Sequence, residues 1–63
     1  MILIATLVNE EDGITVTVTR DDTKFHVRMR DDDSGNLLPH WSIYSNEAQA
    51  MRYAHRISGV EVA

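Results

Sequence analysis

Only one stretch of the 63-residue chain has the period of a helix, residues 45–58, SNEAQAMRYAHRIS. Asn46 can accept a hydrogen bond from a free backbone N–H group of the first turn, and Gly59 can take the left-handed conformation that ends a helix. The apolar residues recur at spacings of three and four and so form one stripe: Ala50, Met51, Ala54 and Ile57. We therefore predict a helix from about Asn46 to Ile57 that lays a thin stripe of small residues on its neighbour.

The residues before this helix alternate between apolar and polar side chains, which is typical of β-strands. Acidic and glycine-containing turns separate them, and Asp12-Gly13 is a strong hairpin signal. The pattern predicts strands over Ile2–Val8, Ile14–Thr19, Lys24–Arg30 and His40–Tyr44. We predict an α+β fold of order ββββα: residues 1–63 form one domain, a four-stranded antiparallel meander with a C-terminal helix packed on one face.

The alternation also predicts the two faces of the sheet. The residues expected to face the core are Ile14, Val16, Val18, Phe25, Val27, Met29, Trp41 and Ile43. Those expected on the outer face are Thr15, Thr17, Thr19, His26, Arg28, Arg30, His40, Ser42 and Tyr44. Pro39 lacks a backbone N–H group, so we expect the last strand at an edge of the sheet.

The first strand is apolar on both faces, with Ile2, Ile4 and Val8 on one side and Leu3, Ala5 and Leu7 on the other. Such a strand is typical of the middle of a doubly covered sheet, or of a sheet whose second face meets another chain. Leaving Leu3 and Leu7 exposed costs about 1.5–3 kcal/mol each. We therefore predict self-association through Leu3, Ala5 and Leu7, as a homodimer. Val60 and Val62, after the helix, either add a short strand or fray.

The composition limits the environment and the sources of stability. The chain has no cysteine, which excludes disulfides and a thiolate zinc site and fits a cytoplasmic location. The apolar start, Met1–Val8, is too short to cross a bilayer and lacks the features of a signal peptide, so we predict no membrane association. A chain of this length buries only about 60% of its unfolded surface, which also favours a partner.

No residue pattern predicts catalysis, a cofactor or a metal. The serines have no nucleophile-elbow context, and the three glycines form no phosphate loop. His26, His40 and His55 lack the spacing of zinc ligands. The acidic run from Asp31 places Asn36 and Ser42 where a calcium loop needs glycine and glutamate. We predict a non-enzyme with no cofactor.

The acidic residues have the most informative placement, because eight of the ten fall in strand connections. In a meander, alternate turns share one end of the sheet, so six carboxylates should meet there: Glu10, Glu11, Asp12, Asp31, Asp32 and Asp33. Such a patch attracts lysine- or arginine-rich surfaces over roughly 8 Å at physiological salt. The alternative is that aspartate serves the turns and solubility alone. We predict that the six residues bind a basic surface of a larger protein.

A second hypothesis is nucleic-acid binding through the outer face, with His26, Arg28, Arg30 and Tyr44. The net charge of −4 and the scarcity of expected exposed aromatic side chains argue against it. A third hypothesis is a purely structural homodimer module.

The segments KFHVRMR and WSIYSNEAQAMRYAHRI, separated by an acidic, glycine-containing turn, resemble the small YegP-like domains of bacteria and phages, which are usually paired or dimeric. The Asp12-Gly13 hairpin and the capped helix also resemble the HicB antitoxin domain, without its DNA-binding extension. In size and acidity the chain is similar to phage accessory proteins, including anti-CRISPR inhibitors. These resemblances imply a phage- or mobile-element-type protein that blocks a larger, nucleic-acid-handling protein, and they imply no catalytic residue.

Overall fold

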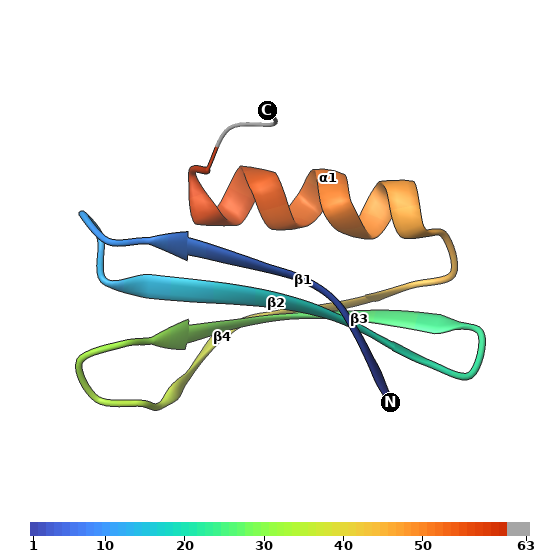
Figure 1. Cartoon of the computed structure of the whole chain (residues 1–63), viewed down its shortest axis with the longest axis horizontal. Coiled ribbons are helices and arrows are strands. Elements are labelled where there is room, and N and C mark those ends of the chain that lie inside the picture. The colour runs from blue at the N-terminus through green and yellow to red at the C-terminus, as the bar shows by residue number, and fades with distance from the viewer. Residues whose placement is uncertain (61–63) are drawn as a thin grey trace.

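The computed structural model describes residues 1–60, except for the side chain of His40. It contains four strands, β1 (Ile2–Asn9), β2 (Ile14–Asp21), β3 (Lys24–Asp31) and β4 (Leu37–Tyr44), followed by one helix, α1 (Glu47–Ser58). The strands form one antiparallel sheet in the order β1-β2-β3-β4, and α1 lies across one face of it (Figure 1). The predicted α+β meander is confirmed, although β4 begins three residues earlier than expected.

The opposite face of the sheet is covered by no element of residues 1–60, and we call it the open face. β4 is an edge strand, as Pro39 predicted. β1 is the other edge strand, which excludes the first of the two alternatives for an apolar strand, a position in the middle of a doubly covered sheet. Because each strand pairs with the next one along the chain, the first strand of the meander has a neighbour on one side only.

The helix begins and ends where its capping residues predicted. Asn46 is extended (φ −131°, ψ 127°), and its side-chain oxygen accepts a hydrogen bond from the Gln49 N–H group at 3.2 Å. Gly59 has φ 74°, and its N–H group donates to the His55 carbonyl at 3.1 Å. Both ends of α1 therefore have partners for backbone groups that lack one inside the helix.

The core lies between α1 and the middle of the sheet. Its buried apolar side chains are Val16, Val18, Val27, Met29, Ala50 and Ala54. The helix contributes only alanines to this set, and a residue without a long side chain lets the helix axis approach the sheet closely. The predicted core positions of β2, β3 and α1 are thus confirmed.

The side chains of β4 lie on the opposite faces of the sheet from those predicted. Tyr44 pairs with Phe25, and Ser42 pairs with Val27, so both lie on the core face, whereas Trp41 pairs with Arg28 and Ile43 with His26. Paired residues of antiparallel strands share a face. Trp41 and Ile43 therefore lie on the open face, where they are 55% and 47% exposed. The predicted inward Trp41 and Ile43 and outward Ser42 and Tyr44 are wrong; the side chain of His40 lies outside the described part.

The register between β3 and β4 explains why the β4 side chains lie on these faces. Opposite Arg28 and Arg30 stand Trp41 and Leu37, so β4 has extra residues where the pairing is irregular. The extra residues are two, an even number, so Leu37, Trp41 and Ile43 share one face, and their pairing with β3 makes it the open face. Alternation within β4 is compatible with both choices, because a one-residue shift exchanges the two faces.

A second irregularity, between Leu3 and Ala5, divides β1. Leu3 pairs with Thr19 on the open face, whereas Ala5 pairs with Val18 and Leu7 with Val16 on the core face. Ala5 and Leu7 pack against the core and are partly buried, while Leu3 is 62% exposed. The prediction that Leu3, Ala5 and Leu7 form one exposed self-association surface is therefore wrong for Ala5 and Leu7. The bulge inserts a residue and reverses the alternation.

The two alternatives for the end of the chain, a short strand or a frayed end, concern mainly residues 61–63, which lie outside the described part. Val60 itself belongs to no strand.

Candidate interaction surface

The open face consists of three cross-strand rows with polar side chains in the middle and, except for Thr6, apolar side chains at their ends. The rows are Leu3-Thr19-His26-Ile43, Thr6-Thr17-Arg28-Trp41 and Val8-Thr15-Arg30-Leu37. The two edge strands supply the apolar ends, while β2 and β3 supply threonine, histidine and arginine. The open face is therefore polar along its centre and apolar along both margins.

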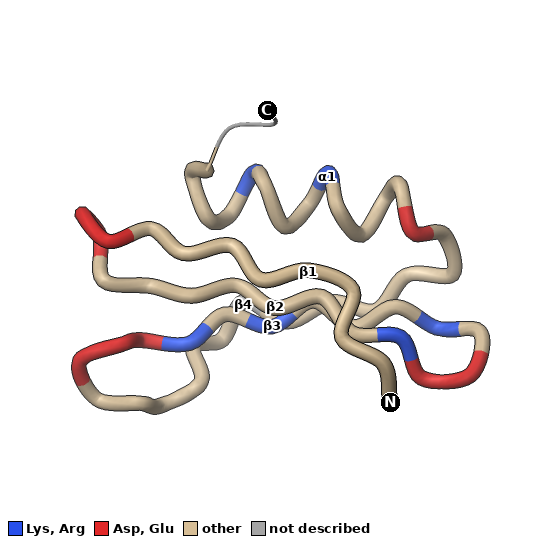
Figure 2. Tube along the Cα trace, viewed as in Figure 1, with Lys and Arg blue, Asp and Glu red and all other residues tan. Residues whose placement is uncertain are grey.

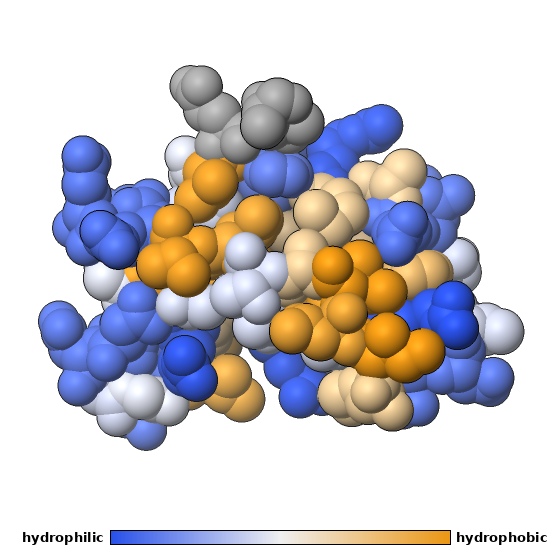
Figure 3. Space-filling model, in the orientation of Figure 1, coloured by the Kyte–Doolittle hydropathy of each residue, from blue (hydrophilic) through white to orange (hydrophobic). Residues whose placement is uncertain are grey.

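The apolar residues at these margins are strongly exposed to solvent. On β1, Leu3 and Val8 are 62% and 50% exposed; on β4, Leu37 is 65% exposed, beside the exposed Trp41 and Ile43. Figure 3 shows hydrophobic side chains gathered over the N-terminal part of β1. Scattered exposed apolar residues are ordinary in proteins, but a set of them on one uncovered sheet face is typical of interaction sites.

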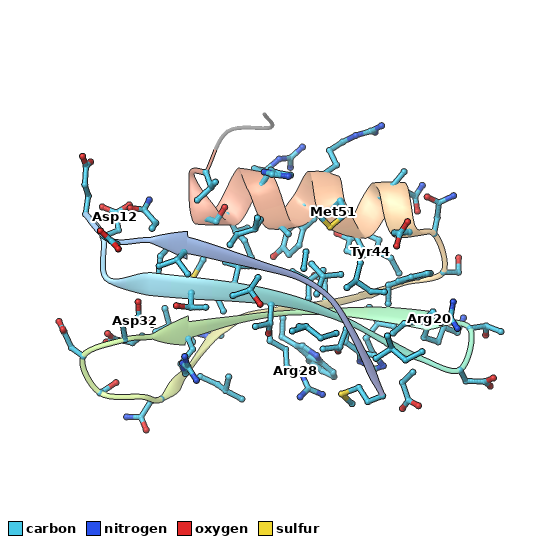
Figure 4. All side chains as sticks on the ribbon, in the orientation of Figure 1. Asp12, Arg20, Arg28, Asp32, Tyr44 and Met51 are labelled. Atoms are coloured by element: carbon cyan, nitrogen blue, oxygen red, sulfur yellow. The ribbon has the colours of Figure 1, made fainter. Side chains whose placement is uncertain are left out.

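A hollow of about 440 Å³ lies on the β4 side, lined by Arg28, Leu37, Leu38 and Trp41. The labelled Arg28 extends from the sheet away from the helix (Figure 4). Tryptophan and arginine are the residues most enriched among those that dominate protein interfaces. Trp41 was expected on the core face instead, because its place depends on the β3–β4 register.

The row through Thr19 and His26 encloses two polar atoms, Thr19 Oγ1 and His26 Nδ1, that are buried and find no hydrogen-bond partner among the described residues. Leu3 and Ile43 stand at the two ends of this row. His26 therefore cannot use Nδ1 to contact a phosphate at the surface.

The nucleic-acid hypothesis named four residues, and the structure brings three of them together. His26, Arg28 and Arg30 lie on the open face, whereas Tyr44 lies on the core face. Its ring contacts that of Tyr53, with 5.7 Å between ring centroids and an angle of 50° between the planes. Tyr44 is thus wrongly assigned to the nucleic-acid face, and Trp41 is the aromatic residue that stands there instead.

The six carboxylates predicted to meet do lie at one end of the sheet, and we call them the acidic cluster: Glu10, Glu11, Asp12, Asp31, Asp32 and Asp33. The Asp32 N–H group donates to the Gly13 carbonyl at 2.8 Å, which joins the β1–β2 and β3–β4 turns. The hydroxyl of Thr15 donates to Asp32 Oδ1 at 2.7 Å. Figure 2 shows the acidic segments of both turns at the same end of the sheet, and Figure 4 shows Asp12 and Asp32 at that end.

Half of the acidic cluster also supports the turns. In addition to Asp32, Asp12 Oδ2 accepts a hydrogen bond from Asn9 Nδ2 at 3.1 Å, and Asp31 Oδ1 accepts one from the Asp33 N–H group at 3.0 Å. Glu10 and Glu11 are exposed. Substitutions that test the charge of the cluster are therefore best made at these two glutamates, which leave the turn hydrogen bonds intact.

Within the described part of the chain, no group of three or more histidine, aspartate or glutamate side chains is arranged to hold a metal ion. No helix among residues 1–60 has the length and apolar character needed to span a bilayer. The chain matches no protein-family model, no curated protein and no solved structure.

Proposed function

We propose that this chain is a non-enzymatic, cytoplasmic protein-binding module that occupies a surface of a larger protein. The open face makes the contact, and the acidic cluster borders it. The observation that carries this proposal is the set of exposed apolar residues on the open face, Leu3, Val8, Leu37, Trp41 and Ile43. A set of exposed apolar residues on one uncovered face is typical of interaction sites, and the polar residues between them can make hydrogen bonds to a partner.

The energetics favour an occupant for this face. Burying apolar surface contributes roughly 25 cal/mol per Å², and Trp41 and Leu37 present large side chains beside a ready hollow. Arg28 can lay its guanidinium along the Trp41 ring and still offer hydrogen-bond donors to a partner. A partner that fills the hollow with an apolar side chain would thus gain both burial and directional contacts.

The acidic cluster determines what kind of protein fits. Six carboxylates at one end of the sheet favour a partner with lysine or arginine residues next to an apolar patch, and nucleic-acid-handling proteins have such surfaces. A partner of this kind would suit a phage-type inhibitor, the class to which the chain is similar in size and acidity.

Charge-removing substitutions at one end of the sheet test the acidic cluster, and the same kind of substitutions at the other end are the matched control. Glu10→Gln with Glu11→Gln removes two negative charges from the acidic cluster, while Asp21→Asn with Asp22→Asn removes two from the opposite turn. Binding of a labelled oligolysine peptide, followed by fluorescence anisotropy at low salt, should weaken about threefold or more in the first variant and change little in the second. Equal weakening in both variants would show that only net charge matters and would contradict a role for the cluster.

The emission of Trp41 tests the open face directly, because it is the only tryptophan of the chain. A partner captured from extracts of the native cell should shift this emission to shorter wavelength when added to the wild type. The same partner should bind Trp41→Ser at least about tenfold more weakly, since truncating a central interface aromatic typically costs 2 kcal/mol or more. Capture that is unaffected by Trp41→Ser, with no emission shift, would place the contact elsewhere and overturn the proposal.

A second candidate, single-stranded nucleic-acid binding, is favoured by one observation. Trp41 pairs directly with Arg28 across β3 and β4, which places an exposed ring beside a cation, the combination used to stack bases. Quenching of Trp41 emission by an oligonucleotide at low salt would support it. The absence of quenching, together with no mobility shift at micromolar protein, would exclude it.

A homodimer formed through the open face is the remaining occupant. Sedimentation over a range of concentrations distinguishes a homodimer from a complex with another protein or with nucleic acid. A second measurement is the Trp41 emission, which depends on the concentration of this protein alone only if the chain self-associates. A monomer with concentration-independent emission would leave the open face free for a different protein.

A further inference from the structure

A separate cavity of about 240 Å³ lies between α1 and the end of β4, away from the open face. It is lined by Tyr44, Gln49, Arg52, Tyr53 and Arg56. The four helical residues follow one another at spacings of three, one and three, which places them on one flank of α1. Tyr44, the last residue of β4, forms the opposing wall. The lining is thus two guanidiniums, two tyrosine rings and one amide.

The two arginines are placed without helical counterions. Arg52 and Arg56 are four residues apart, so their like charges repel across one turn, at a cost of about 0.2–0.5 kcal/mol. None of the positions three or four residues from either arginine holds a carboxylate, and Glu47 is the only acidic residue of α1. The helix dipole favours a cation in the last turn, at Arg56, but it does not call for a second one a turn earlier.

This arrangement is unusual in an acidic chain. The net charge is −4, yet Figure 2 shows the acidic segments at the ends of the sheet and two basic positions along α1. An anion held between Arg52 and Arg56 would replace their repulsion with two charge-assisted contacts. Guanidiniums bind phosphate oxygens through pairs of parallel hydrogen bonds, a geometry that ammonium groups do not supply.

The rings of Tyr44 and Tyr53, which form an aromatic wall of the cavity, favour a ligand that contains a ring. The Tyr44 and Tyr53 rings are half-buried and packed on each other, so they offer a rigid edge beside the two cations. A ring on the ligand can pack against this wall while its charged group meets the arginines. The Gln49 amide and the tyrosine hydroxyls can donate further hydrogen bonds to an oxyanion.

From these contacts we propose that Tyr44, Gln49, Arg52, Tyr53 and Arg56 form a binding site for a small phosphate monoester attached to an aromatic ring. The cavity is smaller than the 300–1,000 Å³ of common ligand pockets, so the site admits a compact ligand. The site is independent of the proposed protein-binding function, because it uses the flank of α1 and none of the residues of the open face.

Titrations of the backbone amide resonances with three probes test the proposal. Phenyl phosphate carries both the ring and the dianion, inorganic phosphate carries only the anion, and phenol carries only the ring. We expect saturable shifts along residues 49–56 with phenyl phosphate, with an affinity about tenfold higher than for inorganic phosphate and little response to phenol. Phenol binding as tightly as phenyl phosphate would overturn the role of the arginines, and equal affinities for the two phosphates would overturn the role of the ring.

A matched pair of variants separates a specific site from general electrostatics. Arg52→Gln with Arg56→Gln removes both guanidiniums from exposed positions, so the fold should persist, which circular dichroism can verify. Arg20→Gln with Lys24→Gln removes the same charge from the β2–β3 end. The first variant should lose phenyl phosphate binding by about tenfold or more, and the second by less than about twofold. Equal losses in both, or no saturable binding to the wild type, would refute the site.

Discussion

Replacing Ala54 with leucine is expected to lower the free energy of unfolding by about 3 kcal/mol. Ala54 is fully buried where α1 meets the sheet, and the core there consists of close-packed valine, methionine and alanine side chains. Extra carbon atoms at such a site force the helix away from the sheet or force side chains out of their preferred rotamers, which costs about 1–3 kcal/mol and occasionally more. A 63-residue domain has only about 3–9 kcal/mol in total, so this single change removes much of its stability.

Ala48→Leu is the matched control, because Ala48 belongs to the same helix and is exposed. The same chemical change there should alter the free energy of unfolding by less than about 0.5 kcal/mol. Urea unfolding followed by circular dichroism measures both variants. If Ala54→Leu were as stable as Ala48→Leu, the close approach of helix and sheet described above would be incorrect.

Replacing Asn9 with alanine is expected to cost about 2 kcal/mol. Asn9 Nδ2 donates to the Ser58 carbonyl at 2.8 Å, and Asn9 Oδ1 accepts from the Asp12 N–H group at 3.1 Å. The side chain therefore ties the end of α1 to the β1–β2 turn across 49 residues of sequence. Its loss leaves the carbonyl of the fully buried Ser58 without this donor, and an unsatisfied buried group costs about 1–3 kcal/mol.

Asn36→Ala provides the comparison for Asn9→Ala, since Asn36 is exposed in the β3–β4 turn and hydrogen-bonds there through its backbone groups. We expect little loss of stability from it. Amide hydrogen exchange adds a local measurement: Asn9→Ala should accelerate exchange at Gly59 and Val60 more than in β3. Uniformly unchanged exchange at the end of α1 would show that Asn9 does not hold it.

The elements of the fold were predictable because their signals are local. Asn46 and Gly59 bound the helix through hydrogen bonds and a backbone conformation that involve only neighbouring residues. Strict alternation in β2 and β3 predicted the core positions of Val16, Val18 and Val27 correctly, since both strands are regular and central. The meeting of the acidic turns was also predictable, because hairpin connections alternate between the two ends of any meander.

The edge strands were less predictable, for two different reasons. In β1 the bulge between Leu3 and Ala5 inserts one residue and reverses the alternation on which the prediction rests. In β4 the alternation is kept, but it does not tell which of the two faces meets the helix, because that depends on the register with β3. The interaction surface consists largely of these two strands. The contact of Asn9 with Ser58 brings together segments far apart in sequence, so no local pattern announces it.

The sequence by itself determined the order of the elements, the ends of the helix, the central core and the acidic turns. Helix capping, strand alternation and turn conformation depend on residues that are close in sequence, and in a meander each strand pairs with the next one along the chain. Only the tertiary structure decided which side chains of the edge strands face solvent. A strand's register depends on pairing with its neighbour, and a shift of one residue exchanges its faces at little local cost. Trp41 therefore stands on the open face and Tyr44 beneath the helix, where the sequence pattern had predicted the reverse.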